Sequence, residues 1–274
     1  MEFTEFIDRK DYLERVYNAL QREKPQFIVI YGRRRIGKSK LIKEIMDWNK
    51  KDIYFLSDQT NETNQRMLFA KTIALGGIED FDKVTYPDWE TLFRALNRQV
   101  KEKTTVCLDE FPYLVKSCQS LPSVIQKLLN EKSLKYNLII CGSSQQLMQG
   151  YILDRKEPLY GLADEIIRLT PIPVRYIGQA LGCDARQSIE EYAIWGGIPR
   201  YWELRADYKD NETAIEKLLL DNKGFLADEP IRLLRDDMRD TIQAATLLSI
   251  IGNGANRLSE IAGRAGKDVT QITE

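Results

Sequence analysis

The chain has 274 residues, with 40 basic and 41 acidic side chains and no histidine. The lack of histidine excludes imidazole acid–base chemistry, a Ser-His-Asp triad and most zinc sites, and the balanced charge gives no overall attraction to nucleic acid. No apolar run approaches the roughly 18 residues of a membrane helix, and the N-terminus lacks the basic and apolar regions of a secretory signal. We therefore expect a cytoplasmic protein of two or three compact units.

Short apolar runs recur along the first part of the chain, and segments with helical periodicity separate them. The runs lie at residues 27–30, 53–56, 106–108, 138–141 and 165–169. Runs of this length predict strands that are buried on both faces, as in a parallel sheet. The clearest helix lies between the second and third runs, where residues 89, 92, 93, 96 and 100 share one apolar face. This alternation of strand and helix predicts an α/β fold.

A glycine-rich loop follows the first predicted strand and precedes a predicted helix. Residues 32–39 read Gly-Arg-Arg-Arg-Ile-Gly-Lys-Ser and fit the Walker A pattern GxxxxGK[ST]. Its glycines let successive N–H groups face phosphate oxygens; Lys38 is expected to hold the β- and γ-phosphates and the Ser39 hydroxyl to ligate Mg²⁺. The alternative for the three arginines is that they lie on a solvated surface and do not contact the nucleotide. The candidate nucleotide-binding residues here are Gly32, Arg33, Arg34, Arg35, Ile36, Gly37, Lys38, Ser39 and Lys40.

The third predicted strand ends in two acidic residues, as a Walker B motif does. Asp109 is expected to hold Mg²⁺ through water, and Glu110 to polarise the water that attacks the γ-phosphate. The second acid favours hydrolysis over transfer to a substrate hydroxyl. Taken alone, such a pair is also common at an ordinary junction between a strand and a turn.

The fourth predicted strand ends in Gly142, Ser143 and Ser144. Either serine could sense the γ-phosphate or orient the attacking water from the neighbouring strand, which adds both to Lys38 and Glu110 as candidate catalytic residues. A plain turn that is capped by glycine and serine explains the same residues equally well.

With these three strand ends in place, the chain resembles the archaeal-type ATPase family, which is related to the AAA+ and STAND P-loop NTPases. Beyond the loop, the resemblance rests on four short segments. They are Phe-Ile-Asp-Arg-Lys at residues 6–10, Leu-Asp-Glu-Phe-Pro-Tyr at 108–113, Pro-Leu-Tyr-Gly at 158–161 and Gly-Gly-Ile-Pro-Arg-Tyr at 196–201.

The resemblance implies a sheet with strand order 5-1-4-3-2, a helical lid and a winged-helix domain, with ATP or ADP and Mg²⁺ as cofactors. It also implies that Phe6, Ile7 and Arg9 frame the adenine and that Pro199 covers it. A helix stop followed by a turn is the alternative for Pro199. Family members often carry an arginine after the Pro-Leu-Tyr-Gly segment, where this chain has a leucine. An arginine finger therefore stays unassigned among Arg155, Arg168 and Arg200.

After residue 171 the strand signals stop, and amphipathic helical stretches follow at 189–195, 215–220 and 242–251. We therefore predict a P-loop ATPase domain at 1–170, a helical lid at 171–236 and a partial winged-helix domain at 237–274. The last segment resembles a helix-turn-helix, and the chain ends within its expected recognition helix without wing strands. DNA binding and a purely helical packing module are both compatible with it.

The candidate site residues are compatible with two alternative functions. The first is an ATPase whose hydrolysis drives or resets a conformational change. The second is a nucleotide-dependent switch, for signalling or DNA-associated work, that hydrolyses slowly until a partner supplies an arginine. A protein partner or self-association is compatible with either function, and the sequence does not identify the client.

Overall fold

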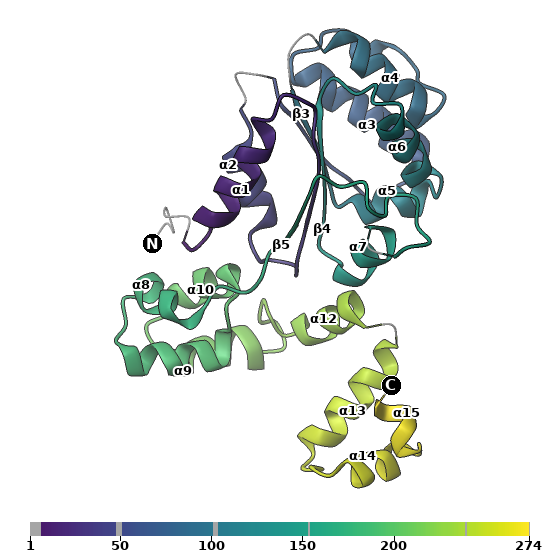
Figure 1. Ribbon diagram of the computed structural model, residues 1–274. Coiled ribbons are helices and arrows are strands. Elements are labelled where there is room, and N and C mark those ends of the chain that lie inside the picture. The colour runs from purple at the N-terminus through teal and green to yellow at the C-terminus, as the bar shows by residue number, and fades with distance from the viewer. Residues whose placement is uncertain (1–6, 48–50, 101–103, 153, 239, 274) are drawn as a thin grey trace. The chain divides into compact units, whose positions relative to one another are not determined.

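The computed structural model describes residues 7–47, 51–100, 104–152, 154–238 and 240–273 (Figure 1). Five parallel strands form one sheet in the order β2-β3-β4-β1-β5. Their bounds are β1 Phe27–Tyr31, β2 Ile53–Leu56, β3 Thr105–Asp109, β4 Asn137–Gly142 and β5 Glu165–Arg168. Read from the β5 edge, this order is 5-1-4-3-2, which confirms the predicted topology.

The three central strands, β1, β3 and β4, are buried along their whole length, whereas the edge strands β2 and β5 are partly exposed. Burial on both faces explains why the central strands read as continuous apolar runs in the sequence. Because the strands are parallel, their carboxyl ends all lie at the same end of the sheet, and the candidate site residues follow these strand ends.

Helices cover both faces of the sheet (Figure 1). The helices α1 (Lys10–Leu20) and α2 (Lys38–Ile45) pack on one face, where Ile28, Ile30 and Ile139 point. The other face packs against a larger set of helices. These are α3 (Glu62–Leu75), η2 (Phe81–Lys83), α4 (Trp89–Gln99), α5 (Phe111–Ser117), α6 (Leu121–Asn130) and α7 (Gln145–Ile152).

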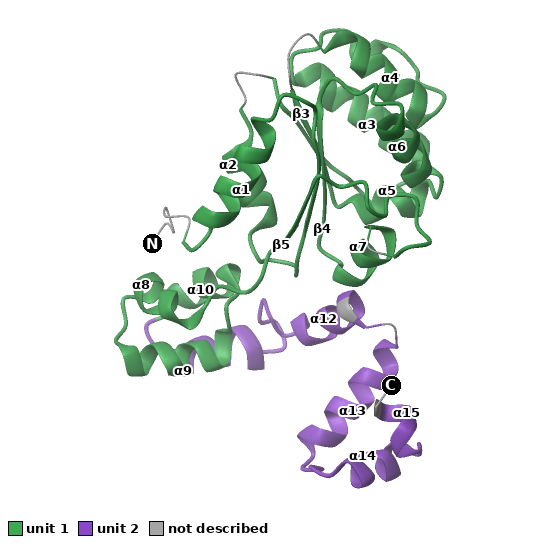
Figure 2. Ribbon diagram, in the orientation of Figure 1, with its two compact units in different colours: residues 1–208 green, residues 209–274 purple. Residues whose placement is uncertain are grey.

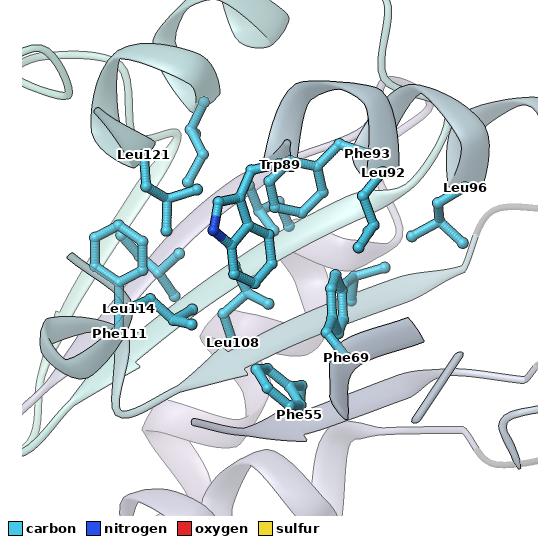
Figure 3. Packing of buried hydrophobic residues seen from close by; sticks show 14 of the residues in the cluster. Phe55, Phe69, Trp89, Leu92, Phe93, Leu96, Leu108, Phe111, Leu114 and Leu121 are labelled. Carbon is cyan, nitrogen blue, oxygen red and sulfur yellow. The ribbon is translucent and has the colours of Figure 1, made fainter. Parts of the chain in front are cut away.

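An aromatic cluster forms the centre of the larger core (Figure 3). Phe69 lies 5.0 Å from Phe55, 5.9 Å from Trp89 and 6.0 Å from Phe93, measured between ring centroids. The five positions of the predicted apolar face, 89, 92, 93, 96 and 100, are all buried, so that prediction is confirmed. Asp88 caps this helix by accepting a 2.7 Å bond from the Thr91 amide.

The segment after β5 is helical and belongs to the same compact unit as the sheet, residues 1–208 (Figure 2). It contains η3 (Val174–Tyr176), α8 (Ile177–Leu181), α9 (Ala185–Trp195) and α10 (Pro199–Ala206). An Asp184 capping box begins α9, and Gly196 ends it.

The second compact unit, residues 209–274, is helical throughout its described part. Its elements are α11 (Asn211–Ile215), the π-helical turn η4 (Glu216–Leu220), α12 (Glu229–Asp237), α13 (Thr241–Gly252), α14 (Leu258–Ala265) and α15 (Val269–Thr273). The two compact units do not coincide with the three predicted domains, whose boundaries at 170 and 236 stay a prediction. Within the described ranges, the helices are all too short or too polar to cross a membrane.

Candidate functional site

The loop between β1 and α2 is shaped by its glycines. A Cβ at Gly32 would lie 2.6 Å from the carbonyl oxygen of Leu169, so no other residue fits there without movement of backbone. Gly37 caps α2 in the left-handed region at φ 98°, which glycine adopts at little cost. Arg35 is also left-handed, at φ 65°. The loop therefore ends at the positive N-terminus of α2, a geometry that suits an anion.

Lys38 lies across this loop. Its ammonium group donates 2.9 Å bonds to the carbonyl oxygens of Gly32 and Arg33, and the residue is only 6% exposed. The charge is therefore held over the first half of the loop. Among the other predicted loop residues, Ile36 is buried in the core under α2, Arg33 and Arg35 are partly exposed, and Arg34 and Lys40 are exposed.

The end of β3 brings the two predicted metal ligands together. Asp109 is 1% exposed, and its Oδ2 accepts a 2.9 Å bond from the Ser39 hydroxyl at the start of α2. The same oxygen accepts a 2.5 Å bond from the Tyr54 hydroxyl, which comes from β2. Oδ1 accepts a 2.9 Å bond from the Glu110 amide.

Tyr54 is a site residue that the sequence analysis missed. Burial, and then the neighbouring Asp109 carboxylate, raise the pKa of the Tyr54 phenol well above its ordinary value. The hydroxyl therefore stays protonated and donates to the carboxylate. The only signal in the sequence is its place on a strand that the implied topology puts beside β3.

Glu110 has an unusual backbone and a fixed side chain. It takes a left-handed conformation, with φ 54° and ψ 43°, where β3 turns into α5. Such conformations are uncommon for residues other than glycine and concentrate at functional sites. Its Oε2 accepts a 2.9 Å bond from the Ser143 hydroxyl and a 3.3 Å bond from the Ser143 amide. The carboxylate is thus tied to the end of β4.

The two serines that follow β4 have different surroundings. Ser143 contacts Glu110, whereas the Ser144 hydroxyl accepts a 3.3 Å bond from the Leu147 amide at the start of α7. Ser143 is therefore placed next to the predicted catalytic base. Ser144 acts as a helix cap in this structure.

Of the residues predicted to surround a base, Ile7 and Arg9 directly precede α1 and Pro199 begins α10. Arg9 is buried, and its guanidinium donates to the carbonyl oxygens of Ile36 at 3.1 Å and Thr170 at 3.0 Å. Burial lowers the pKa of this guanidinium. Ile7 lines an open cavity of about 790 Å³ together with Tyr12 and residues 175, 176 and 179. Phe6 lies outside the described residues.

Pro199 is the first residue of α10, after a segment that is held tightly against the chain following β5. The Ile172 amide donates a 2.8 Å bond to the Gly197 carbonyl oxygen. A Cβ at Gly197 would lie 2.2 Å from the Ile172 carbonyl oxygen, so this close approach requires glycine. Ile198 belongs to the same buried cluster as Ile36 of the loop. The start of α10 is therefore attached to the face of the sheet that carries the loop.

The three arginines considered as fingers lie on different elements. Arg155 is exposed in the chain after α7, and Arg168 is exposed at the end of β5, paired in register with Tyr31. Arg200 forms a 2.8 Å ion pair with Glu203 one turn further along α10. Exposed pairs of this kind contribute little stability.

Comparisons with known proteins identify a family and a fold. A family model of ATPase domains predominantly from Archaea matches residues 6–201. An uncharacterised protein of Methanocaldococcus jannaschii is 28% identical over 275 aligned positions, which cover 98% of this chain and 59% of that protein. The chain therefore spans about three fifths of the length of this relative.

Two solved structures share the fold. A Walker-type ATPase of Pyrococcus abyssi superposes with a TM-score of 0.71 and 19% identity, over 94% of this chain and 83% of that one. The ORC1 protein of Aeropyrum pernix, solved in complex with DNA, gives a TM-score of 0.55 and 15% identity, over 97% and 81% of the two chains. At these identities the likeness extends to the fold alone.

Proposed function

Because the chain belongs to the family of ATPase domains found predominantly in Archaea, we propose that it binds ATP with Mg²⁺ at the β1–α2 loop and hydrolyses it. One observation carries the proposal: the 2.9 Å bond from Ser39 to Asp109 joins the helix that follows the loop to the end of β3. This bond places a hydroxyl and a carboxylate together beside a phosphate-binding geometry. Oxygen donors of these two kinds fit Mg²⁺.

The loop and the N-terminus of α2 would hold the phosphates through backbone N–H groups. Lys38 would leave the carbonyl oxygens of Gly32 and Arg33 and bond to the β- and γ-phosphates. Ser39 would hold Mg²⁺ directly, and Asp109 would hold it through water. When bound, Mg²⁺ would neutralise charge on the phosphate oxygens. In this assignment, residues 32–39 are a Walker A motif and Asp109 with Glu110 is a Walker B pair.

Glu110 would act as the general base. Its carboxylate would orient a water toward the γ-phosphorus and accept the proton as the new P–O bond forms and the bond to ADP breaks. Ser143 would hold the carboxylate and would sense the γ-phosphate. The base of ATP would lie between Ile7 and Pro199, with Arg9 fixing the N-terminal segment to the loop. Hydrolysis would then change how α8–α10 sit on the sheet.

A slow nucleotide-dependent switch is the second candidate, and a specific observation favours it. Both groups needed for turnover are already bonded within the protein: Lys38 to the loop carbonyls and Glu110 to Ser143. Lys38 must leave the loop carbonyls before it can bind the phosphates, and the bond from Ser143 restrains the Glu110 carboxylate. A protein partner, or a second copy of the chain, that supplies an arginine would then set the rate.

The test measures ATP binding and phosphate release with Mg²⁺. Lys38→Ala removes a charged donor to the phosphates, so ATP affinity is expected to fall about 10- to 100-fold. Glu110→Gln keeps the shape of the side chain but cannot accept the proton, so it is expected to bind ATP normally and to hydrolyse it about 10²- to 10⁴-fold more slowly. Lys71→Ala, at an exposed lysine of α3, is the matched control and should behave as wild type.

The outcomes separate the two candidates. A wild type that binds ATP but releases no phosphate favours the switch, and addition of a partner becomes the next measurement. A wild type that does not bind ATP, or a Lys38→Ala variant that binds it as well as the Lys71→Ala control, rules out both functions at this loop.

A further inference from the structure

Tyr54 contributes a hydrogen bond to the proposed metal site from outside the motifs that define it. It lies on β2, whose flanking residues Ile53 and Phe55 point into the larger core, so alternation directs Tyr54 to the α2 side of the sheet. In the parallel register Tyr54 is paired with Cys107, two positions before Asp109 on the same face. The length of a tyrosine side chain spans this diagonal, and the hydroxyl reaches the carboxylate.

The Tyr54 ring is held by its own contacts. The Lys43 ammonium of α2 lies 5.8 Å from the ring centroid, within range of a cation–π interaction. The ring is partly buried against the cluster under α2. A substitution that keeps the ring therefore keeps this packing and changes only the hydroxyl.

Hydroxyl and amide groups of neighbouring elements bond to the Asp109 carboxylate. Ser39 of α2 and Tyr54 of β2 both donate to Oδ2, and the Glu110 amide donates to Oδ1. A serine hydroxyl has one proton and two lone pairs, so the direction of its donated bond decides where its lone pairs point. The orientation of the carboxylate therefore controls the orientation of the Ser39 oxygen.

We propose that Tyr54 is a positioning residue for the metal site: its hydroxyl fixes the Asp109 carboxylate, which in turn directs a lone pair of Ser39 toward Mg²⁺. This role rests on the proposed function. Hydrogen-bond partners of metal-holding groups commonly change metal affinity about 10- to 100-fold when removed. Tyr54 acts through Asp109, so we place its effect near the lower end of this range.

The test is Tyr54→Phe in the full chain, with calorimetric titration of ATP at increasing Mg²⁺ and in EDTA. The Mg²⁺ concentration that half-restores tight ATP binding is expected to rise about tenfold, while ATP affinity in EDTA stays at the wild-type value. Tyr86→Phe is the matched control, since that hydroxyl donates a 3.1 Å bond to the Phe81 carbonyl oxygen in the core between α3 and α4. The control should leave the Mg²⁺ requirement unchanged.

A double-mutant comparison checks that the effect passes through Asp109. Added to Asp109→Asn, the Tyr54→Phe change is expected to alter the Mg²⁺ requirement less than about twofold, because coupled residues are not additive. A full tenfold increase in that background would overturn the role, as would a Tyr54→Phe variant with wild-type or tighter Mg²⁺ binding. A wild type that binds ATP with no dependence on Mg²⁺ overturns the proposed metal site and the role of Tyr54 together.

A second measurement retains the tyrosine hydroxyl and does not remove it. Site-specific 3-fluorotyrosine at position 54 keeps the hydroxyl, and its ¹⁹F resonance is expected to move when Mg²⁺ is added to the complex with ATP. A resonance that stays in place upon Mg²⁺ addition, while ATP binding tightens, contradicts the proposal without affecting the ATPase assignment.

Discussion

At Gly32 the backbone packs so closely that an added methyl group would not fit. The glycine packs against the carbonyl of Leu169, and the Leu169 amide in turn donates a 2.8 Å bond to the Tyr31 carbonyl oxygen. The nearest atom, the Leu169 carbonyl oxygen, belongs to backbone that is bonded to the end of β1, so it cannot move aside as a flexible side chain would. The first glycine of the motif is therefore required by close packing.

Gly32→Ala is expected to lower the free energy of unfolding by about 1–3 kcal/mol, the usual cost of an overpacked site, and to weaken ATP binding. Urea unfolding followed by circular dichroism measures the first effect. Gly150→Ala on α7 is the control, because its Cβ would meet nothing within 4 Å. That change should be neutral or stabilising by up to about 1 kcal/mol. Equal stability of the two variants would contradict the packing argument.

At the scale of elements, a nearly buried ion pair joins α9 and α10. The Arg205 guanidinium contacts both carboxylate oxygens of Glu191, at 2.6 to 3.1 Å, and also donates a 2.8 Å bond to the Tyr208 carbonyl oxygen. The side chains are 11% and 9% exposed. This pair fixes the crossing of the two helices that flank the Gly-Gly-Ile-Pro segment.

Glu191→Gln leaves the Arg205 charge buried without its counter-charge, so we expect a loss of about 3 kcal/mol in the free energy of unfolding, at the lower end for buried pairs. Thermal and urea unfolding measure it. The exposed pair between Arg186 and Glu190 on α9 provides the comparison. Arg186→Ala should change stability by less than about 0.5 kcal/mol. A Glu191→Gln variant as stable as this control would show that the pair adds nothing.

The sequence predicts the elements better than the contacts between them. Apolar runs placed all five strands, because burial on both faces leaves a continuous signal. The bonds of Tyr54 to Asp109 and of Glu110 to Ser143 depend on the register of neighbouring strands, which a single sequence does not reveal. The buried position of Arg9 depends on Thr170, 161 residues away in the chain. The roles of the site residues therefore stay proposals.

At the scale of the whole molecule, the compact unit of residues 1–208 contains the sheet, both core clusters and every proposed site residue. The match to the ATPase family, residues 6–201, also lies within it. The described part of residues 209–274 forms helices whose role the fold alone does not assign.

A chain that ends at Tyr208 is therefore expected to bind Mg·ATP within about threefold of the full chain, a difference of about 0.7 kcal/mol. Calorimetry on the two chains, prepared with the same tag, makes the comparison. A loss of more than about tenfold, or about 1.4 kcal/mol, would show that residues 209–274 take part in binding.

The boundary after Tyr208 also separates the part of the chain that contains tryptophan from the part that does not. All four tryptophans, at positions 48, 89, 195 and 202, precede it. Trp195 and Trp202 belong to α9 and α10, and the Trp202 indole donates a 2.6 Å bond to the Gly196 carbonyl oxygen. Tryptophan emission therefore comes from residues 1–208, and two of the tryptophans lie beside the segment that is proposed to cover the base. Residues 209–274 are silent in the same experiment, so their response to nucleotide needs an introduced label.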